Sequence, residues 1–159
     1  DENKVKYIGV SLINFKHLKY ILKYNFDIIQ LSLNVFDQRI LGKKIFSIIK
    51  KKNVLIHARS IFLQGCLLEK TIPKKLRKHK KVFFNFENFL SENNLTREIA
   101  CLDFVLKQKD LINKYVFGVN SLDEIKKIIK TLKNLKRFKK IDYSKLCVNN
   151  KYLIDPFRW

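Results

Sequence analysis

The sequence predicts an α/β protein in which parallel β-strands alternate with α-helices. Four apolar, β-branched runs recur along the chain, at 5–11, 26–33, 53–59 and 114–120. A segment with helical spacing of its apolar residues follows each run. Strands that are apolar on both faces and alternate with helices are typical of a parallel sheet, in which functional side chains gather at the carboxyl ends of the strands.

Helices are expected at 14–24, about 37–52, 82–90, 95–106 and 121 to about 135. Ser11 or Asn14 is expected to cap the first helix. Ser121-Leu-Asp-Glu124 matches the capping box S-x-x-E and opens the last helix. Its buried face is expected to hold Ile125, Ile128, Ile129 and Leu132. The final residues, 152–159, are expected to pack on the surface.

The 159 residues, of which 47% are apolar, are enough for one domain with its own core, and we assign 1–159 to a single domain. The cysteines form no C-x-x-C pair, which indicates neither a disulfide framework nor a zinc site and fits a reducing cytoplasm: Cys66, Cys101 and Cys147. The three histidines lack the spacing of metal ligands, and His57 is expected to be a packed core residue. No metal is therefore expected.

No apolar run approaches the roughly 18 residues of a membrane span, and we expect no membrane partner. The N-terminus has neither the positive nor the apolar region of a signal peptide. The sequence also lacks an initiator Met, and we expect it to begin within a longer protein.

The formal charge of +20, from 28 Lys and 6 Arg against 14 acidic residues, raises the question of a polyanion partner. Lys is spread over nearly every helix rather than gathered in one stripe, which favours a genome-wide residue bias over nucleic-acid binding. The densest positive run is 69–81, interrupted by Pro73. We expect a solvated loop there, over the carboxyl-terminal rim of the sheet; contact with an anionic ligand is the alternative.

Two polar residues interrupt the apolar strands. Gln30 stands in the second run and needs hydrogen-bond partners if it is buried. Arg59 ends the third run, where an unpaired buried guanidinium is costly. It has either a ligand-binding role or an ion pair with an acid such as Asp27 or Asp37.

Several motifs, in this order along the chain, resemble the second half of an aldo-keto reductase: Ile8-Gly-Val-Ser11, Phe26-Asp-Ile-Ile-Gln-Leu31, Leu33-Asn-Val-Phe-Asp-Gln38, His57-Ala-Arg-Ser-Ile-Phe-Leu-Gln-Gly65 and Val116-Phe-Gly-Val-Asn-Ser121. The resemblance covers nearly the whole chain. It implies a (β/α)8, TIM-type barrel that binds a nicotinamide dinucleotide at its C-terminal face and moves hydride to or from a carbonyl. The four strands here resemble the fifth to the eighth. The length agrees, because a full barrel takes about 250 residues.

The resemblance also implies roles for single residues. Ser11 and Gln30 would hydrogen-bond the nicotinamide carboxamide, and Arg59, beside Ser60, would stack on the nicotinamide ring and favour its reduced, neutral form. The loop from Ile61 to Gly65 would wrap the pyrophosphate. The expected cofactor-binding residues are Ser11, Gln30, Arg59, Ser60, Phe62, Gln64, Gly65, Gly118, Val119, Ser121 and Glu124. The family's catalytic Asp, Tyr, Lys and His lie on its first four strands, which nothing here resembles.

The choice between NAD and NADP stays open at the level of sequence. Gly118, Val119 and Ser121 resemble the adenosine-phosphate seat, and Glu124 stands near the expected ribose. Its carboxylate would repel a 2′-phosphate and favour NAD, although it also serves as the capping-box acid. Lys126 and Lys127 are close enough in sequence to compensate.

We therefore expect the cofactor-binding half of an NAD(P)-dependent oxidoreductase acting on a small carbonyl or alcohol substrate such as a sugar. Because four parallel strands leave two open edges, the expected partner is the missing N-terminal half-barrel or a second copy of the chain. Alternatives are a catalytically inactive, dinucleotide-binding regulatory subunit and a basic protein that binds a polyanion or nucleic acid.

Overall fold

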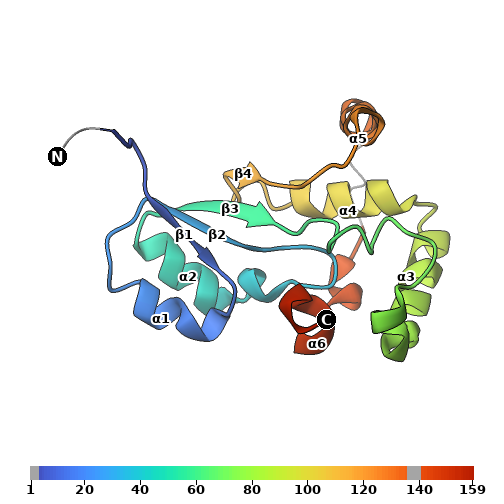
Figure 1. The fold of residues 1–159 in the computed structure, drawn as a ribbon, viewed down its shortest axis with the longest axis horizontal. Helices are drawn as coiled ribbons and strands as arrows, with labels where there is room; N and C mark the ends of the chain where they lie inside the picture. The colour runs from blue at the N-terminus through green and yellow to red at the C-terminus, as the bar shows by residue number, and fades with distance from the viewer. Residues whose placement is uncertain (1–3, 136–140) are drawn as a thin grey trace.

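A computed structural model describes residues 4–135 and 141–159. It contains a four-stranded parallel sheet in the order β1-β2-β3-β4 (Figure 1). The strands are β1 (Gly9–Leu12), β2 (Ile28–Ser32), β3 (Leu55–Arg59) and β4 (Lys114–Tyr115). β2, β3 and β4 lie within the predicted runs, β1 begins four residues later than its run and ends one residue beyond it, and the parallel βα arrangement is confirmed. The fourth strand is much shorter than predicted, because only Val116 extends the pairing, through its N–H to Ala58 O, before the chain leaves β3.

The helical segments connect and flank these strands: η1 (Phe15–His17), α1 (Leu18–Ile21), η2 (Arg39–Leu41), α2 (Lys43–Lys51), η3 (Lys74–His79), α3 (Lys80–Glu92), α4 (Arg97–Leu106), α5 (Leu122–Asn134), η4 (Tyr143–Leu146), α6 (Lys151–Ile154) and η5 (Pro156–Arg158), the η segments being 3₁₀ helices. Side-chain caps explain several starts. Asn14, not Ser11, caps η1, and Thr96 and Ser121 cap α4 and α5. Within the described ranges, no helix is both long and apolar enough to cross a membrane.

The strand register divides the sheet into two chemically different faces. On one face, alternate residues of the central strands are buried among the core residues: Ile29, Leu31, Ile56 and Ala58. Figure 1 shows α1 and α2 lying along one side of the sheet. The pairing places Ser11, Gln30, His57 and Lys114 side by side in one row of the opposite face, which we call the open face.

The open face is polar and only partly covered. Ser11 and Lys114 are exposed, and Gln30, His57 and Arg59 are half-buried. His57 was expected in the packed core, but strand alternation turns it to this open face, since its neighbours Ile56 and Ala58 face the core. The sheet is therefore apolar on one face and polar on the other.

The core continues beyond the sheet into the helices that follow β3. Phe36 contacts Phe83 and Phe86 edge to face, with ring centroids 5.7 and 5.5 Å apart. The C-terminal segment joins this core: Leu153 and Ile154 are buried, so the expectation that the tail packs only on the surface was wrong. The alternation of Tyr152 outside with Leu153 and Ile154 inside marks α6 as amphipathic.

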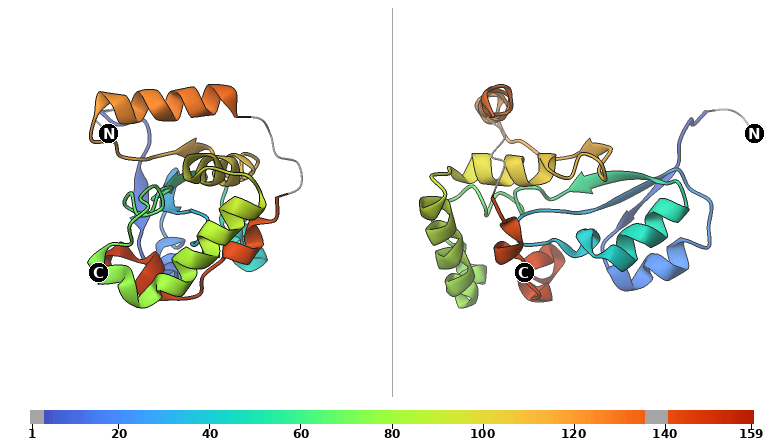
Figure 2. Two further views of the ribbon diagram at one scale, coloured as in Figure 1. Left: turned by 90° about the vertical axis from the view of Figure 1, so that its right-hand side faces the viewer. Right: turned by 180° about the vertical axis from the view of Figure 1, so that it is seen from behind.

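Two other expectations need correction. The positive run 69–81 was expected to be a loop, but η3 begins directly after Pro73 and α3 begins at Lys80, two residues earlier than predicted. Pro73 precedes the first turn, where it needs no N–H partner, and Leu76 anchors that turn in the core. On α5 only Ile128 is buried, while Ile129 and Leu132 are exposed. Figure 2 shows why: α5 lies apart from α1, α2 and α3 and has little beside it except α4.

Candidate functional site

Ser11 and Gln30 meet directly on the open face. They are register partners on β1 and β2, and the Ser11 hydroxyl donates a hydrogen bond to Gln30 Oε1 at 3.4 Å. The Gln30 Nε2 donors and the Ser11 lone pairs remain available toward the open side. The two side chains together therefore present donors and acceptors of the kind that an amide ligand needs.

Arg59 lies over the carboxyl ends of three strands. It is the last residue of β3, yet its Nη2 donates to the backbone oxygen of Leu12, the last residue of β1, at 3.4 Å. Its Nη1 donates to Ser60 Oγ at 3.0 Å. Since β2 lies between β1 and β3, the guanidinium spans the middle strand on the side of Ser11 and Gln30.

Arg59 forms no ion pair with Asp27 or Asp37, the two acids considered as its alternative partners. Asp37 is fully buried and is held by Arg39, whose Nε and Nη2 donate to its two oxygens at 2.7 Å each. Asp27 accepts instead from the N–H of Ile8 at 2.8 Å. Arg59 makes no ion pair with any described residue, and burial lowers the pKa of its guanidinium despite the charges of Asp37 and Asp155. Among the described residues no carboxylate pairs with this half-buried guanidinium, so it is available to a ligand.

Asn34 is a site residue that sequence reasoning missed. It is fully buried after β2, its Nδ2 donates to Ser60 O at 3.0 Å, and its Oδ1 accepts from the N–H groups of Phe36 and Asp37. Asn34 thus fixes the start of the loop that follows Arg59. A polar amide directly after an apolar strand was the available signal.

The loop after β3 has an unusual backbone. Ser60, Leu63 and Gln64 have φ values of 59, 48 and 54°, and Gly65 has 80°. Left-handed conformations of non-glycine residues cost about 1 kcal/mol or more each and cluster at ligand-binding loops. Leu63 is nevertheless fully buried, which anchors the loop, while Gln64 is exposed and Gly65 half-buried at its tip.

The loops after β3 and β4 touch through two aromatic rings. Phe62 and Phe117 have ring centroids 5.7 Å apart in an edge arrangement. Phe62 is buried, so core packing accounts for it. The contact places Gly118 and Val119, which follow Phe117, beside the loop of residues 60–68. Gly118 is exposed and a Cβ there would meet nothing within 4 Å.

Ser121 and Glu124 form the predicted cap of α5. Ser121 Oγ accepts from the N–H of Glu124 at 3.2 Å, and Glu124 Oε2 accepts from the N–H of Asn120 at 2.6 Å. Both residues are exposed. Of the two lysines expected to compensate Glu124, Lys127 pairs instead with Glu98 of α4. The carboxylate of Glu124 is thus fixed at the start of α5.

The structure therefore brings the predicted residues together in two groups. Ser11, Gln30, Arg59 and Ser60 form one group, joined by hydrogen bonds and strand register. The second group is formed by Gly118, Val119, Ser121 and Glu124. The loop that contains Phe62, Gln64 and Gly65 lies between them, and among the described residues no hydrogen bond or ion pair joins the two groups.

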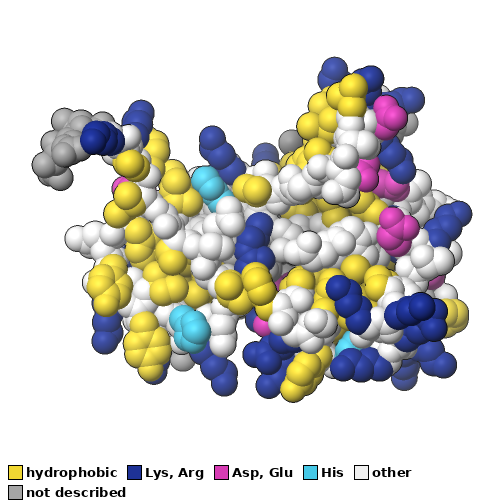
Figure 3. Space-filling view, in the orientation of Figure 1, with side chains coloured by type: hydrophobic (Ala, Val, Ile, Leu, Met, Phe, Trp, Pro, Cys, Tyr) yellow, Lys and Arg dark blue, Asp and Glu magenta, His cyan; other side chains and the backbone are white. Residues whose placement is uncertain are grey.

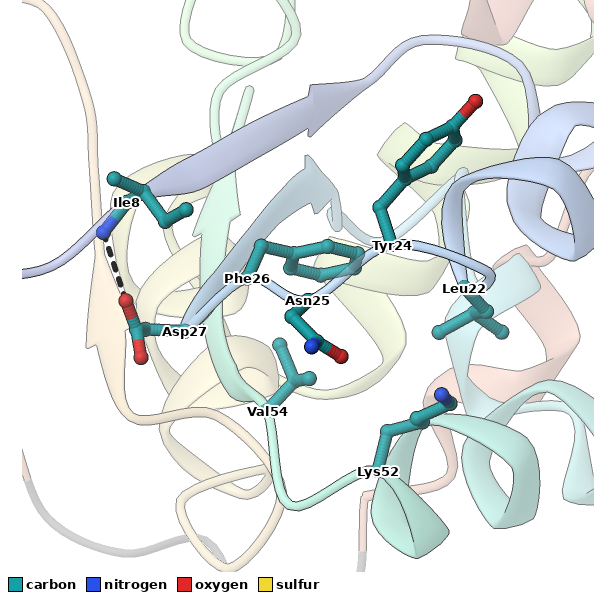
Figure 4. A pocket seen from close by; sticks show the side chains of 8 residues that line it. All are labelled: Ile8, Leu22, Tyr24, Asn25, Phe26, Asp27, Lys52 and Val54. Atoms are coloured by element: carbon teal, nitrogen blue, oxygen red, sulfur yellow. Dashed lines mark hydrogen bonds between the residues drawn. The ribbon is translucent and has the colours of Figure 1, made fainter.

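A cavity of about 220 Å³ lies at the other end of the sheet (Figure 4). Its lining includes Phe26, Asp27 and Val54, which precede β2 and β3, with Ile8 before β1. In βα sheets, chemistry is found at the carboxyl ends of the strands, and the amino ends contribute to stability. This cavity is therefore separate from the candidate site.

Solved structures of low sequence identity share the fold. An aldo-keto reductase AKR11C1 from Bacillus halodurans in its holo form has a TM-score of 0.69 at 19% identity, with 96% of this chain and 51% of that chain covered. The apo form gives 0.66 at 18%, with 96% and 54% covered. MGS-M4, an aldo-keto reductase from a Medee basin deep-sea metagenome library, gives 0.53 at 18%, with 94% and 51% covered. This chain thus spans about half the length of each.

A search of curated protein sequences found no match. The model of the aldo/keto reductase family matches residues 1–147, nearly the whole chain. The sequence motifs, the four parallel strands and the open polar face agree with that match. This chain belongs to the aldo/keto reductase family, whose members are NAD(P)-dependent oxidoreductases.

Proposed function

We propose that this chain is the dinucleotide-binding half of an aldo/keto reductase barrel, equivalent to its fifth to eighth strands. The observation that carries the proposal is the meeting of Ser11, Gln30 and Arg59, from three different strands, on the open face at the carboxyl ends. Such a group matches a planar carboxamide and an aromatic ring. The chain's own residues would bind and orient the cofactor; the bound cofactor supplies the hydride.

The nicotinamide end would occupy the first group of residues. Ser11 and Gln30 would hydrogen-bond the carboxamide, and the guanidinium of Arg59, which donates to Leu12 O and Ser60 Oγ, would stack on the ring. Its fixed positive charge would favour the neutral reduced ring over the cationic oxidised one. Loop residues Gln64 and Gly65 would approach the pyrophosphate.

The adenosine end would occupy the second group, at the start of α5. Gly118 leaves room for close approach of a phosphate, and the N–H groups of the first turn of α5 favour an anion. Glu124 favours NAD over NADP, because its carboxylate, which accepts from the N–H of Asn120, would repel a 2′-phosphate. Lys127 does not offset this negative charge, since it pairs with Glu98. Lys126 is the remaining cation that opposes this choice, so NADP stays the second candidate.

The open face and the two sheet edges support a partner that completes the barrel. β1 and β4 each have one unpaired edge in the described sheet, and Val116, on the open side of β4, is 41% exposed. A complementary four-stranded half would cover this face and supply the catalytic acid and base that nothing in this chain resembles. A small carbonyl or alcohol substrate would then be reduced or oxidised between the two halves, with a Tyr of the other half supplying the proton.

The test is a fluorescence titration of the chain with NADH and with NADPH. Binding that is weakened at least tenfold by Gln30→Leu and by Arg59→Met supports the proposal, since each change removes polar contacts to the nicotinamide end. As a control, Lys145→Gln alters an exposed residue of η4. Equal affinities for the chain and all three variants, or no binding of either dinucleotide, would contradict it.

A further inference from the structure

A second cavity, of about 450 Å³, lies outside the candidate site, between the segment after β3 and α3. Its size is in the range of small-molecule sites, about 300–1,000 Å³. Its floor is apolar and includes Ile72 and Phe83. Phe83 is buried against Phe36, so the floor is fixed by the core.

An exposed aromatic ring borders the same cavity. Phe84 follows Phe83 on α3 and is 63% exposed, although it has no polar group that would benefit from water. Each Å² of apolar surface left in water costs about 25 cal/mol relative to its burial. The cavity therefore offers buried and exposed apolar surface that an apolar ligand chain would cover.

Positive charge surrounds this apolar surface. Lys70, Lys80 and Lys81 line the cavity, are exposed, and make no ion pair with any described residue. Of the two carboxylates in the lining, Glu87 pairs with Arg97. The lining thus has four cationic side chains against two carboxylates, an excess of two positive charges.

Two of these lysines do not stabilise α3 where they stand. Lys80 and Lys81 stand in the first turn of α3, which contains no acidic residue, although the helix dipole disfavours cations there. Figure 3 shows Lys and Arg side chains gathered on the side of the molecule where α3 lies. Repulsion within this group is relieved when an anion binds.

We propose that this cavity binds an amphiphile with an apolar chain and one anionic head group, of the class of a fatty-acid carboxylate. The chain would lie on Ile72, Phe83 and Phe84, and the head group would pair with Lys80 and Lys81. A small inorganic anion would leave the apolar floor in water, and a neutral lipid would leave the lysines unpaired. The acyl chain is supplied either by a free fatty acid or by an anionic lipid in a bilayer.

The probe is laurate, titrated into the chain by calorimetry below its micellar concentration. The double change Lys80→Gln and Lys81→Gln is expected to weaken laurate at least tenfold, and Phe84→Ser about as much. The matched control is Lys130→Gln with Lys133→Gln, two exposed lysines of α5, and is expected to leave the affinity within twofold. Lauryl alcohol is expected to bind at least tenfold more weakly than laurate. Far-UV circular dichroism verifies that each variant is folded.

A second arm distinguishes the source of the acyl chain. Vesicles of phosphatidylglycerol and of phosphatidylcholine are sedimented with the chain and with the same variants. Binding of monomeric laurate identifies a free fatty acid; retention only on phosphatidylglycerol vesicles, lost in the α3 variants, identifies a bilayer lipid. The proposal is overturned if neither probe binds, if the α5 control weakens binding as much as the α3 variants, or if Phe84→Ser has no effect.

Discussion

The guanidinium of Arg59 donates a hydrogen bond to the backbone oxygen of Leu12, so the last residue of β3 reaches the last residue of β1 across the strand between them. This contact holds a charged planar group on the open face, which also carries the hydrogen-bonded Ser11–Gln30 pair. The position of that group is the basis for the proposed nicotinamide site.

Arg59→Met is expected to change the preference between oxidised and reduced cofactor. The methionine keeps apolar contact with the ring but removes the charge that opposes a cationic nicotinamide. An interaction of about 1 kcal/mol, the value for two unit charges about 4 Å apart in water, corresponds to about a fivefold change in relative affinity, in favour of NAD⁺. Titration of both redox forms into both proteins measures the ratio. An unchanged ratio would exclude stacking by Arg59.

Glu124→Gln is expected to show whether Glu124 discriminates between NADH and NADPH or only caps α5. Glutamine keeps an acceptor oxygen for the N–H of Asn120 but removes the negative charge. The affinity for NADPH should rise about fivefold relative to NADH, while the melting temperature changes little. If the ratio stays constant while the melting temperature falls, Glu124 is only the cap of α5.

Gly9→Ala is expected to destabilise the sheet. A Cβ at this position would lie 2.9 Å from both the Cβ and the backbone oxygen of Ile28 on the neighbouring strand, which is closer than real contacts. The strain should lower the free energy of unfolding by about 1–3 kcal/mol. Gly118→Ala is the matched control, because nothing lies within 4 Å of its added Cβ. Urea denaturation compares the two, and equal losses would contradict the close approach of β1 and β2.

Tyr143→Phe is expected to destabilise the core that links α4 to the C-terminal segment. The Tyr143 hydroxyl donates to the buried Asp103 at 2.8 Å, and Lys107 pairs with the same carboxylate oxygen at 2.8 Å. Loss of the hydrogen bond should cost about 1–3 kcal/mol in the free energy of unfolding. Tyr24→Phe, at a residue 73% exposed, is the control and should cost nearly nothing.

The same tyrosine predicts a pH dependence. Burial and the hydrogen bond to Asp103 raise the pKa of Tyr143 above its usual value near 10. Tyr143 therefore contributes its full stabilisation below pH 10 and less at higher pH, because there only the unfolded chain releases the tyrosine proton. This contribution to the free energy of unfolding falls by up to about 1.4 kcal/mol per pH unit. Tyr143→Phe should remove this part of the decline. Equal slopes in both proteins between pH 10 and 11 would contradict it.

The open face predicts self-association of the isolated chain. Two unpaired edges and an uncovered face invite pairing with a second copy. Sedimentation velocity is expected to detect dimers or larger species, or the chain should be poorly soluble. A monodisperse monomer that melts cooperatively would count against a half-barrel that needs a partner.

Sequence patterns predicted the elements whose burial is decided locally. The second and third strands, the position of the first and the cap at Ser121 were predicted correctly because alternation, β-branching and capping chemistry are local signals. The predicted length of β4 was wrong because an edge strand ends where its neighbour stops pairing with it. The residues of the edge strand alone do not determine that point. The buried face of α5 was overestimated for the same reason: no element of the described chain covers Ile129 and Leu132, which stay exposed.

For the site, sequence predicted which residues are present but not their partners. Gln30 was recognised as needing a hydrogen bond, yet the hydroxyl that supplies it lies 19 residues earlier. Asp37 was considered for Arg59, although Arg39, two residues away, binds it. Such choices depend on register and side-chain direction across strands, which only the folded chain defines.

The most direct test of the central claim is a titration of ¹⁵N-labelled chain with NADH, followed by amide chemical shifts. We expect the signals of Ser11, Gln30 and Arg59 to shift together with those of Gly118 and Ser121, at one common dissociation constant. Shifts confined to other parts of the chain, or different constants for the two groups, would contradict a single dinucleotide site on this face.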